Sequence, residues 1–170
     1  MNTGDFLRLI AGGILALVSS YIGFMVKNGY KENTKLMKDL VFFCDEFKRE
    51  LSCQKTSVID FCNKFKKDKK SKICDLLEDF VSQLESAGQF SKDIDKWNLA
   101  HLKTQEKQEI LTFFNGLGKT PTYEQISFVE RNCALFKDRQ KQAEENEKKK
   151  GNMFFKLFVL LGVAIMVIVG

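Results

Sequence analysis

Residues 6–26 read FLRLIAGGILALVSSYIGFMV, and this stretch decides the fold because it carries a single charge, Arg8. At about 1.5 Å of rise per residue, a helix over this stretch crosses a hydrocarbon layer of about 30 Å. A cleaved signal peptide is the rival interpretation. However, Asp5 stands where a basic cluster is expected, and residues 20–24 offer no convincing cleavage site. We predict an N-terminal transmembrane helix within residues 1–27.

A second apolar run covers residues 153–170, MFFKLFVLLGVAIMVIVG, with Lys156 near enough to its start to reach the interface. Lysines crowd the inner sides of both runs. Positive charge within about 15 to 20 residues of a span favours the cytoplasmic side. The middle of the chain is therefore predicted to be cytoplasmic, in a cell-membrane protein with two transmembrane helices. The lysines concerned are Lys27, Lys31, Lys35, Lys38, Lys148, Lys149 and Lys150.

Small residues recur along the first apolar run, and this spacing lets another helix approach closely. Ser19 with Gly23 repeats the spacing beside the main row. Glycine is also common in membrane helices for other reasons. The partner of this face is either the second run, which offers Gly162, or another chain. The predicted packing residues are Gly12, Ala16, Ser20 and Gly23.

The middle of the chain has the pattern of an all-α domain. There is one proline in 170 residues, and hairpin signals are few. Apolar residues recur at spacings of three and four, which lines one face of a helix. We predict a cytoplasmic helical bundle at residues 28–141 and a polar helical stalk at residues 142–152. The C-terminal transmembrane helix follows at residues 153–170.

The apolar faces mark the expected bundle helices. Ser57 or Thr56 is the expected N-cap of the second helix, and the third is expected to end near Gly88. The fifth is expected to stop at Gly116 and Gly118. The faces cover residues 36–51, 58–65, 73–84, 94–97, 110–114 and 126–136.

Several classes of function find little support in the residues. The net charge of +5, from 27 basic and 22 acidic residues, is mild, so nucleic acid is not indicated. Five cysteines without a C-x-x-C pair and a single histidine, His101, do not give zinc spacing. Neighbouring carboxylates lie on lysine-mixed polar faces and are better explained as solvated surface than as acid and base. We expect no enzymatic activity, no cofactor and no metal.

A phosphate-binding loop is suggested by GLGKT at residues 116–120, but the pattern is incomplete. The position of the first glycine of G-x-x-x-x-G-K-[ST], five before Gly118, is occupied by Phe113. No strand is expected before it. Nucleotide binding is therefore not predicted.

A basic run at residues 64–72 has two interpretations. It is either a solvated loop between helices or a contact for anionic lipid or an acidic protein surface, since each basic residue near such lipid contributes about 1 kcal/mol. The candidate contact residues are Lys64, Lys66, Lys67, Lys69, Lys70 and Lys72.

A series of short motifs resembles a known family. LIAG at residues 9–12 and YIGF at residues 21–24 lie in the first run, and EL at 50–51 precedes SV at 57–58. EKQEIL at residues 106–111 is followed by Phe113, LG at 117–118 and Gln125. In this order the motifs resemble the stage III sporulation protein AB family of endospore-forming bacteria over nearly the whole chain. The chain departs from the family pattern at Pro121, where aspartate is usual, and at Ser57, where proline is usual.

The resemblance implies a role in the channel-like complex that links mother cell and forespore during engulfment. It implies a place in the mother-cell (outer forespore) membrane, with other channel membrane subunits as partners. The soluble part is similar to the helical platform domain of inner-membrane proteins of type II secretion and type IV pilus machines. That similarity implies docking of a cytoplasmic secretion-type ATPase, the AA protein of the same operon.

The turn formed by Leu117 and Gly118 carries the most specific part of the resemblance, and we expect a polar docking corner around it. The alternative function is a passive membrane tether or signalling hairpin whose domain binds a regulator or anionic lipid. Membrane lipid is a partner in either case, and a second copy of the chain is a further candidate. The candidate docking residues, all expected to be exposed, are Lys119, Thr120, Tyr123 and Gln125.

Overall fold

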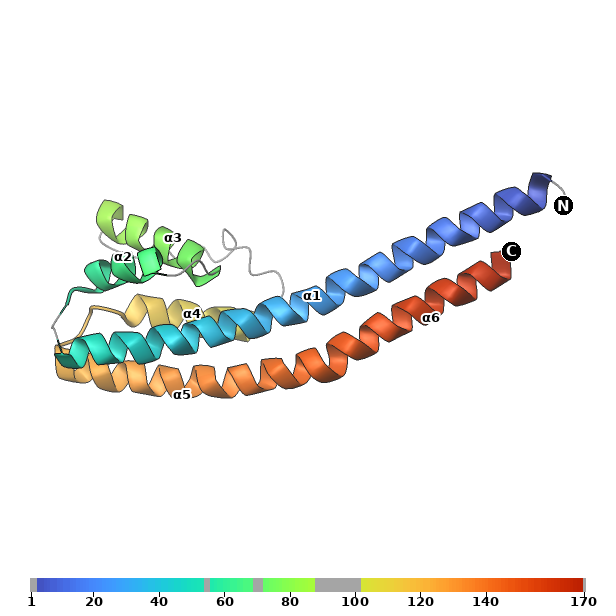
Figure 1. Ribbon diagram of the computed structural model, residues 1–170. Coiled ribbons are helices and arrows are strands. Elements are labelled where there is room, and N and C mark those ends of the chain that lie inside the picture. The colour runs from blue at the N-terminus through green and yellow to red at the C-terminus, as the bar shows by residue number, and fades with distance from the viewer. Residues whose placement is uncertain (1–2, 54–55, 69–71, 88–101, 170) are drawn as a thin grey trace. The chain divides into compact units, whose positions relative to one another are not determined.

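The computed structural model is built of helices (Figure 1). It describes residues 3–53, 56–68, 72–87 and 102–169, and no strand occurs among them. The all-α prediction is confirmed, while the helix expected at residues 94–97 lies outside the described residues. The helices are α1 (Thr3–Cys53), α2 (Val58–Asp68), α3 (Lys72–Ala87), α4 (Thr104–Gly116), α5 (Thr122–Asn146), the π-helical turn η2 (Glu147–Gly151) and α6 (Asn152–Val169).

The chain forms two compact units. The terminal unit consists of Met1–Thr34 and Gln142–Gly170, and the middle unit consists of Lys35–Lys141. Helix α1 runs for 51 residues and contributes to both units. The polar stretch at residues 27–35 does not interrupt it, because it holds no proline and its one glycine costs only about 1 kcal/mol in a helix. Residues 142–152 are helical as well, divided among α5, η2 and α6.

Two helical stretches are long and apolar enough to cross a membrane by length and composition. Ile10–Cys53 contains an 18-residue window of mean hydropathy 1.7, and Thr122–Ile168 contains one of mean hydropathy 2.2. Large apolar side chains of the terminal unit are exposed, among them Leu17 and Ile168. A contiguous apolar surface of this kind needs a cover. A hydrocarbon layer provides such a cover along the full length of a helix.

The core of the middle unit is a cluster of phenylalanine rings. Phe43 of α1 is fully buried, and its ring centroid lies 5.2 to 6.2 Å from those of its aromatic neighbours. Phe80 of α3 joins the cluster 5.2 Å from Phe114, and Phe136 of α5 joins it 5.3 Å from Phe113. Each described helix of the middle unit thus supplies at least one ring. The neighbours of Phe43 are Phe47, Phe61, Phe65, Phe113 and Phe114.

The start of α2 confirms one of the two predicted caps. The backbone N–H of Asp60 donates to Ser57 Oγ at 3.1 Å, and the Ser57 hydroxyl donates to Asp60 Oδ2 at 2.6 Å. This reciprocal pair satisfies a backbone donor that the first turn of a helix otherwise leaves free. Thr56 donates instead to Glu50 Oε1 at 3.1 Å, which ties the end of α1 to the start of α2.

We expect residues 35–141 to fold on their own, and Phe43→Ala to destabilise this fragment by about 3–5 kcal/mol. The loss reflects the transfer of a fully buried ring and the cavity it leaves. Urea unfolding followed by far-UV circular dichroism measures it. Tyr123→Ala is the control, since that side chain is 82% exposed. A broad, uncooperative transition of the parent fragment would count against an autonomous bundle.

Candidate functional site

The corner between α4 and α5, residues 117–121, is held in a sharp turn. Leu117 is buried, and its N–H donates to the carbonyl of Phe114 at 3.2 Å. Gly118 has a φ of +76°, as the sequence predicts for a glycine that closes a helix. A Cβ there would be strained and would lie 3.2 Å from Val58 Cγ2. Glycine at 118 therefore sets both the turn and its closeness to α2.

Gln125 is buried at 2% exposure, so the prediction of an exposed docking residue is wrong. Its Oε1 accepts hydrogen bonds from the Gly118 N–H at 3.1 Å and from the Thr120 hydroxyl at 3.2 Å. The physical reason is that the turn takes the Gly118 N–H out of the helical ladder, and a buried donor requires an acceptor. The amide Nε2 has no hydrogen-bond partner among the described residues. Gln125 thus belongs to the internal framework of the corner.

The spacing of the sequence contains a signal for this burial. Gln125 lies four residues before Val129 and eight before Cys133, which are both buried on the inner face of α5. A residue at that spacing points to the same side of a helix. The polarity of glutamine alone predicted an exposed side chain. Its helical phase predicts burial, which is what the structure shows.

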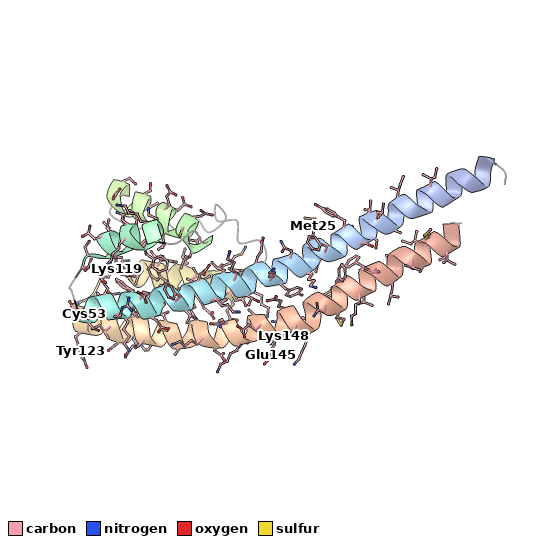
Figure 2. The ribbon with its side chains drawn as sticks, in the orientation of Figure 1. Met25, Cys53, Lys119, Tyr123, Glu145 and Lys148 are labelled. Atoms are coloured by element: carbon pink, nitrogen blue, oxygen red, sulfur yellow. The ribbon has the colours of Figure 1, made fainter. Side chains whose placement is uncertain are left out.

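Three predicted docking residues remain exposed around the corner: Lys119, Thr120 and Tyr123. Figure 2 labels Lys119 and Tyr123 at the end of the middle unit where α4 ends and α5 begins. Tyr123 is 82% exposed, whereas Phe42, another exposed ring of the middle unit, is 39% exposed. Beside it lies a shallow hollow, lined by Thr120, Tyr123, Glu124, Ser127, Phe128, Glu130 and Arg131.

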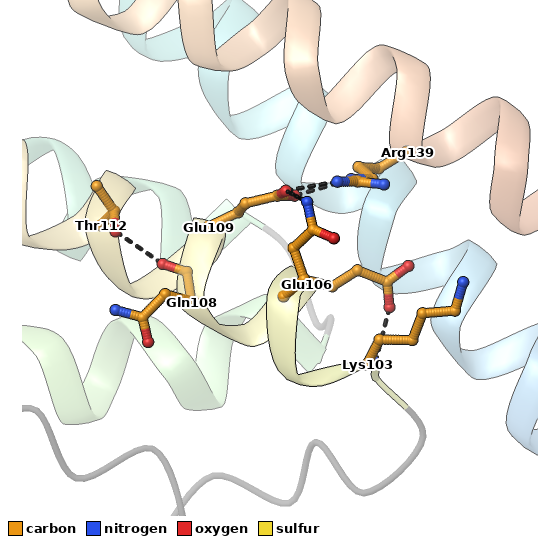
Figure 3. A network of polar contacts seen from close by, with 7 residues as sticks. Lys103, Glu106, Gln108, Glu109, Thr112 and Arg139 are labelled. Carbon is orange, nitrogen blue, oxygen red and sulfur yellow. Dashed lines mark hydrogen bonds and ion pairs between the residues drawn. The ribbon is translucent and has the colours of Figure 1, made fainter.

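The motif at residues 106–111 fixes α4 behind this corner. The Glu106 carboxylate is buried and accepts the backbone N–H of Lys103 at 2.9 Å, closing the start of the helix. Glu109 accepts two hydrogen bonds from Arg139 of α5, at 2.8 and 2.5 Å, as Figure 3 shows. Both side chains are 17% exposed, and the bond to Glu109 raises the pKa of Arg139. A bidentate pair of this kind fixes orientation as well as distance.

Sequence reasoning did not find Arg139. It lies 30 residues from Glu109 in the chain, and no local spacing indicates the pair. The contact depends on α4 and α5 folding back on each other at the corner.

The cysteines show no sign of a metal centre. No group of three or more potential metal ligands occurs within the described parts of the chain. Burial raises the pKa of Cys62 to about 12, and burial with a contact to Cys133 raises that of Cys44. Cys133 donates to Asp45 Oδ1 at 3.2 Å. Cys44 and Cys62 therefore remain neutral thiols at physiological pH and act as small apolar residues.

The basic run lies partly on a helix, because α2 extends to Asp68. Lys64 Nζ is 3.3 Å from Glu50 Oε1, so this lysine has an acidic neighbour in the protein. A shallow hollow is lined by Lys66 and Lys67 with Asn63 and Glu78. The interpretation of this run as a loop does not hold for residues 64–68, which continue α2 because Phe65 is buried on its inner face. Lys69, Lys70 and the side chain of Lys72 lie outside the described residues.

Helices α1 and α6 approach closely within the terminal unit. A Cβ at Gly162 would lie 3.0 Å from the Ala16 carbonyl oxygen, and one at Gly23 would lie 2.7 Å from Phe158 Cβ. Neither position leaves room for a larger residue. Small residues permit this approach of backbones, as expected for helices in hydrocarbon.

The remaining small residues of α1 differ in their contacts. Ser19 is buried and donates its hydroxyl to the carbonyl of Phe158 at 2.8 Å, across to α6. Ser20 donates instead to the carbonyl of Ala16 in its own helix, at 2.9 Å. Gly12 is buried. The interhelical hydrogen bond thus comes from Ser19, the neighbour of the predicted Ser20.

We expect Gly118→Val to destabilise the middle unit by about 2 kcal/mol or more. Positive φ is unfavourable for a β-branched residue, and the new side chain meets Val58. Lys119→Glu, at the exposed neighbouring position, should change stability by less than about 0.5 kcal/mol. Urea titration of both variants measures the difference. Equal stability of the two would show that the turn does not require glycine.

Comparison with known proteins places the chain in a family. The family model named stage III sporulation protein AB matches residues 8–169. The match takes in both apolar runs, the corner at residues 117–121 and the motif at residues 106–111. No curated protein and no solved structure gives a significant match. The chain belongs to the stage III sporulation protein AB family.

Proposed function

We propose that this chain is a non-enzymatic membrane platform in a secretion-like sporulation channel between mother cell and forespore. The terminal unit anchors it through two transmembrane helices. The middle unit lies in the cytoplasm and docks a secretion-type ATPase at the corner between α4 and α5. Family membership and two sufficiently long apolar helices support the general part of this proposal.

The exposed aromatic ring at a rigid corner is the observation that carries the docking role. Tyr123 presents its ring to solvent at 82% exposure, two residues from Gln125, whose hydrogen bonds fix the corner. Tyrosine is enriched among the residues that dominate binding energy, because it offers a large contact area at a low entropic cost. A ring next to a rigid turn loses little further conformational entropy on binding.

The charges near the corner indicate which kind of partner surface would bind there. Lys119 is exposed, and it has no salt bridge to a described residue. On the neighbouring face, Glu130 is already paired with Lys48 at 2.5 Å. The free positive charge therefore favours a partner that brings a carboxylate to Lys119. Such complementarity mainly increases association rate and specificity.

The alternative, a tether that binds a regulator or anionic lipid, draws on the hollow beside Lys66 and Lys67. Two lysines face a single carboxylate there, Glu78, which leaves net positive charge. This surface lies on α2 and α3 and is separate in residues from the corner. Substitutions can therefore test the two surfaces independently.

We expect the double variant Lys119→Glu, Tyr123→Ala to weaken capture of the operon's ATPase by the detergent-solubilised chain about tenfold or more. Spore formation should fall with it, while the unfolding midpoint stays the same because both side chains are exposed. The matched control is Lys67→Glu, Phe42→Ala, which makes the same changes of charge and ring elsewhere on the middle unit. Full ATPase capture by the corner variant would refute docking there. Loss only in the control would move the contact to the surface of α1 and α2 that carries Phe42 and Lys67.

A further inference from the structure

The π-helical turn η2 presents three consecutive lysines where the apolar run of α6 begins. Its residues are Glu147–Gly151, and Lys148, Lys149 and Lys150 are all exposed. A π-helical turn is rare and recurs at functional sites more often than elsewhere. Met153, two residues beyond η2, opens the apolar run.

Gly151 seats this turn against α1. The glycine is buried, and a Cβ there would lie 3.7 Å from both Lys27 Cγ and Tyr30 Cβ. Gly151 thus faces α1, while the three lysines before it are exposed to solvent. The seat is thus a built feature of the terminal unit.

Aromatic rings surround the seat. Lys27 Nζ lies 5.4 Å from the centroid of the Phe155 ring, and the rings of Tyr30 and Phe154 stack with centroids 6.5 Å apart. Aromatic and basic side chains together are typical of the boundary between hydrocarbon and headgroups. The contacts therefore place this boundary at the level of Gly151, directly beside the three lysines.

The order of charged residues along the chain also places the lysines next to the apolar run. Glu144, Glu145 and Glu147 precede the lysines, so the carboxylates stand farther from the apolar run than the ammonium groups do. Lys149 Nζ is 3.5 Å from Glu145 Oε2, a largely exposed pair of little strength. Lys148 and Lys150 form no salt bridge within the described residues. Their charges are available to an external anion.

We propose that Lys148, Lys149 and Lys150 form a binding surface for the headgroups of anionic phospholipids. The phosphate oxygens accept hydrogen bonds from the ammonium groups, while the acyl chains cover the exposed apolar side chains of α6. An acidic protein is the less suitable partner, because the lysines adjoin side chains that hydrocarbon would cover. The proposal rests on the membrane anchoring proposed above and is independent of ATPase docking.

The test uses the full chain reconstituted in phosphatidylcholine vesicles that contain phosphatidylglycerol. Electron paramagnetic resonance of spin-labelled lipids gives the preference of the protein for phosphatidylglycerol over phosphatidylcholine. Each lysine near an anionic surface contributes about fivefold to such binding. The variant Lys148→Gln, Lys149→Gln, Lys150→Gln removes three such charges and should therefore reduce the preference by at least about fivefold and by up to about 100-fold. High salt should reduce the preference of the parent chain, because it screens these charges.

Two control variants make the result specific. Lys64→Gln, Lys66→Gln, Lys67→Gln removes the same charge from α2 and should keep the preference. Replacement of Lys148, Lys149 and Lys150 by arginine retains charge and should keep it as well. Circular dichroism of each protein checks that the helices persist.

Retention of the preference by the glutamine variant of η2 would overturn the proposal. Loss only in the α2 variant would overturn it too, and would assign lipid binding to Lys64, Lys66 and Lys67. A parent chain without any preference for phosphatidylglycerol would overturn the proposal as well. Undiminished ATPase capture by the η2 glutamine variant would show that lipid binding at η2 and ATPase docking at the corner are independent.

Discussion

In hydrocarbon, every backbone N–H and C=O must find its hydrogen-bond partner within the protein, because no water is present to replace it. Helices α1 and α6 of the terminal unit are suited to this constraint, because a helix satisfies its own backbone groups. Association of the two helices then depends on contact rather than on the hydrophobic effect. Gly162 against Ala16 and Gly23 against Phe158 allow that contact, and Ser19 adds a hydrogen bond to it. In the arrangement proposed above, both helices span the membrane, so the chain leaves and re-enters it on the same side and both ends of the middle unit lie there.

The middle unit is stabilised by a different force, the removal of apolar surface from water. The phenylalanine cluster draws rings from each described helix of the unit, α1 to α5, which makes it their common contact. The Glu109 and Arg139 pair orients α4 against α5 at its edge. The corner beyond them carries the exposed Tyr123. A rigid corner suits the docking role proposed above, because a preorganised surface loses little freedom on binding.

Much of this arrangement could be predicted from local sequence. The spacing of Leu36, Leu40 and Phe43 gives the buried face of α1, and the glycine after Leu117 gives the positive φ. Ser57 is a cap because its hydroxyl accepts a hydrogen bond from the backbone N–H three residues later, which has no partner within the helix. Each of these outcomes depends on residues within two turns of each other, where propensity and spacing decide.

The hydrogen bonds of Gln125 to the corner could not be predicted without the fold, since the Gly118 N–H requires this acceptor only because Gly118 lies outside the helix. The Arg139 pair likewise follows from a contact across 30 residues that no local motif records.

The side of the membrane on which the middle unit lies tests the account most directly, and the chain carries its own reporters. All five cysteines lie within the middle unit, and Cys53 is exposed. An impermeant maleimide applied to intact bacterial cells should leave the wild-type chain unlabelled and should label it after permeabilisation. Thr3→Cys should add one label in intact cells. Labelling of the wild-type chain in intact cells would place the middle unit outside the cytoplasm and contradict the account.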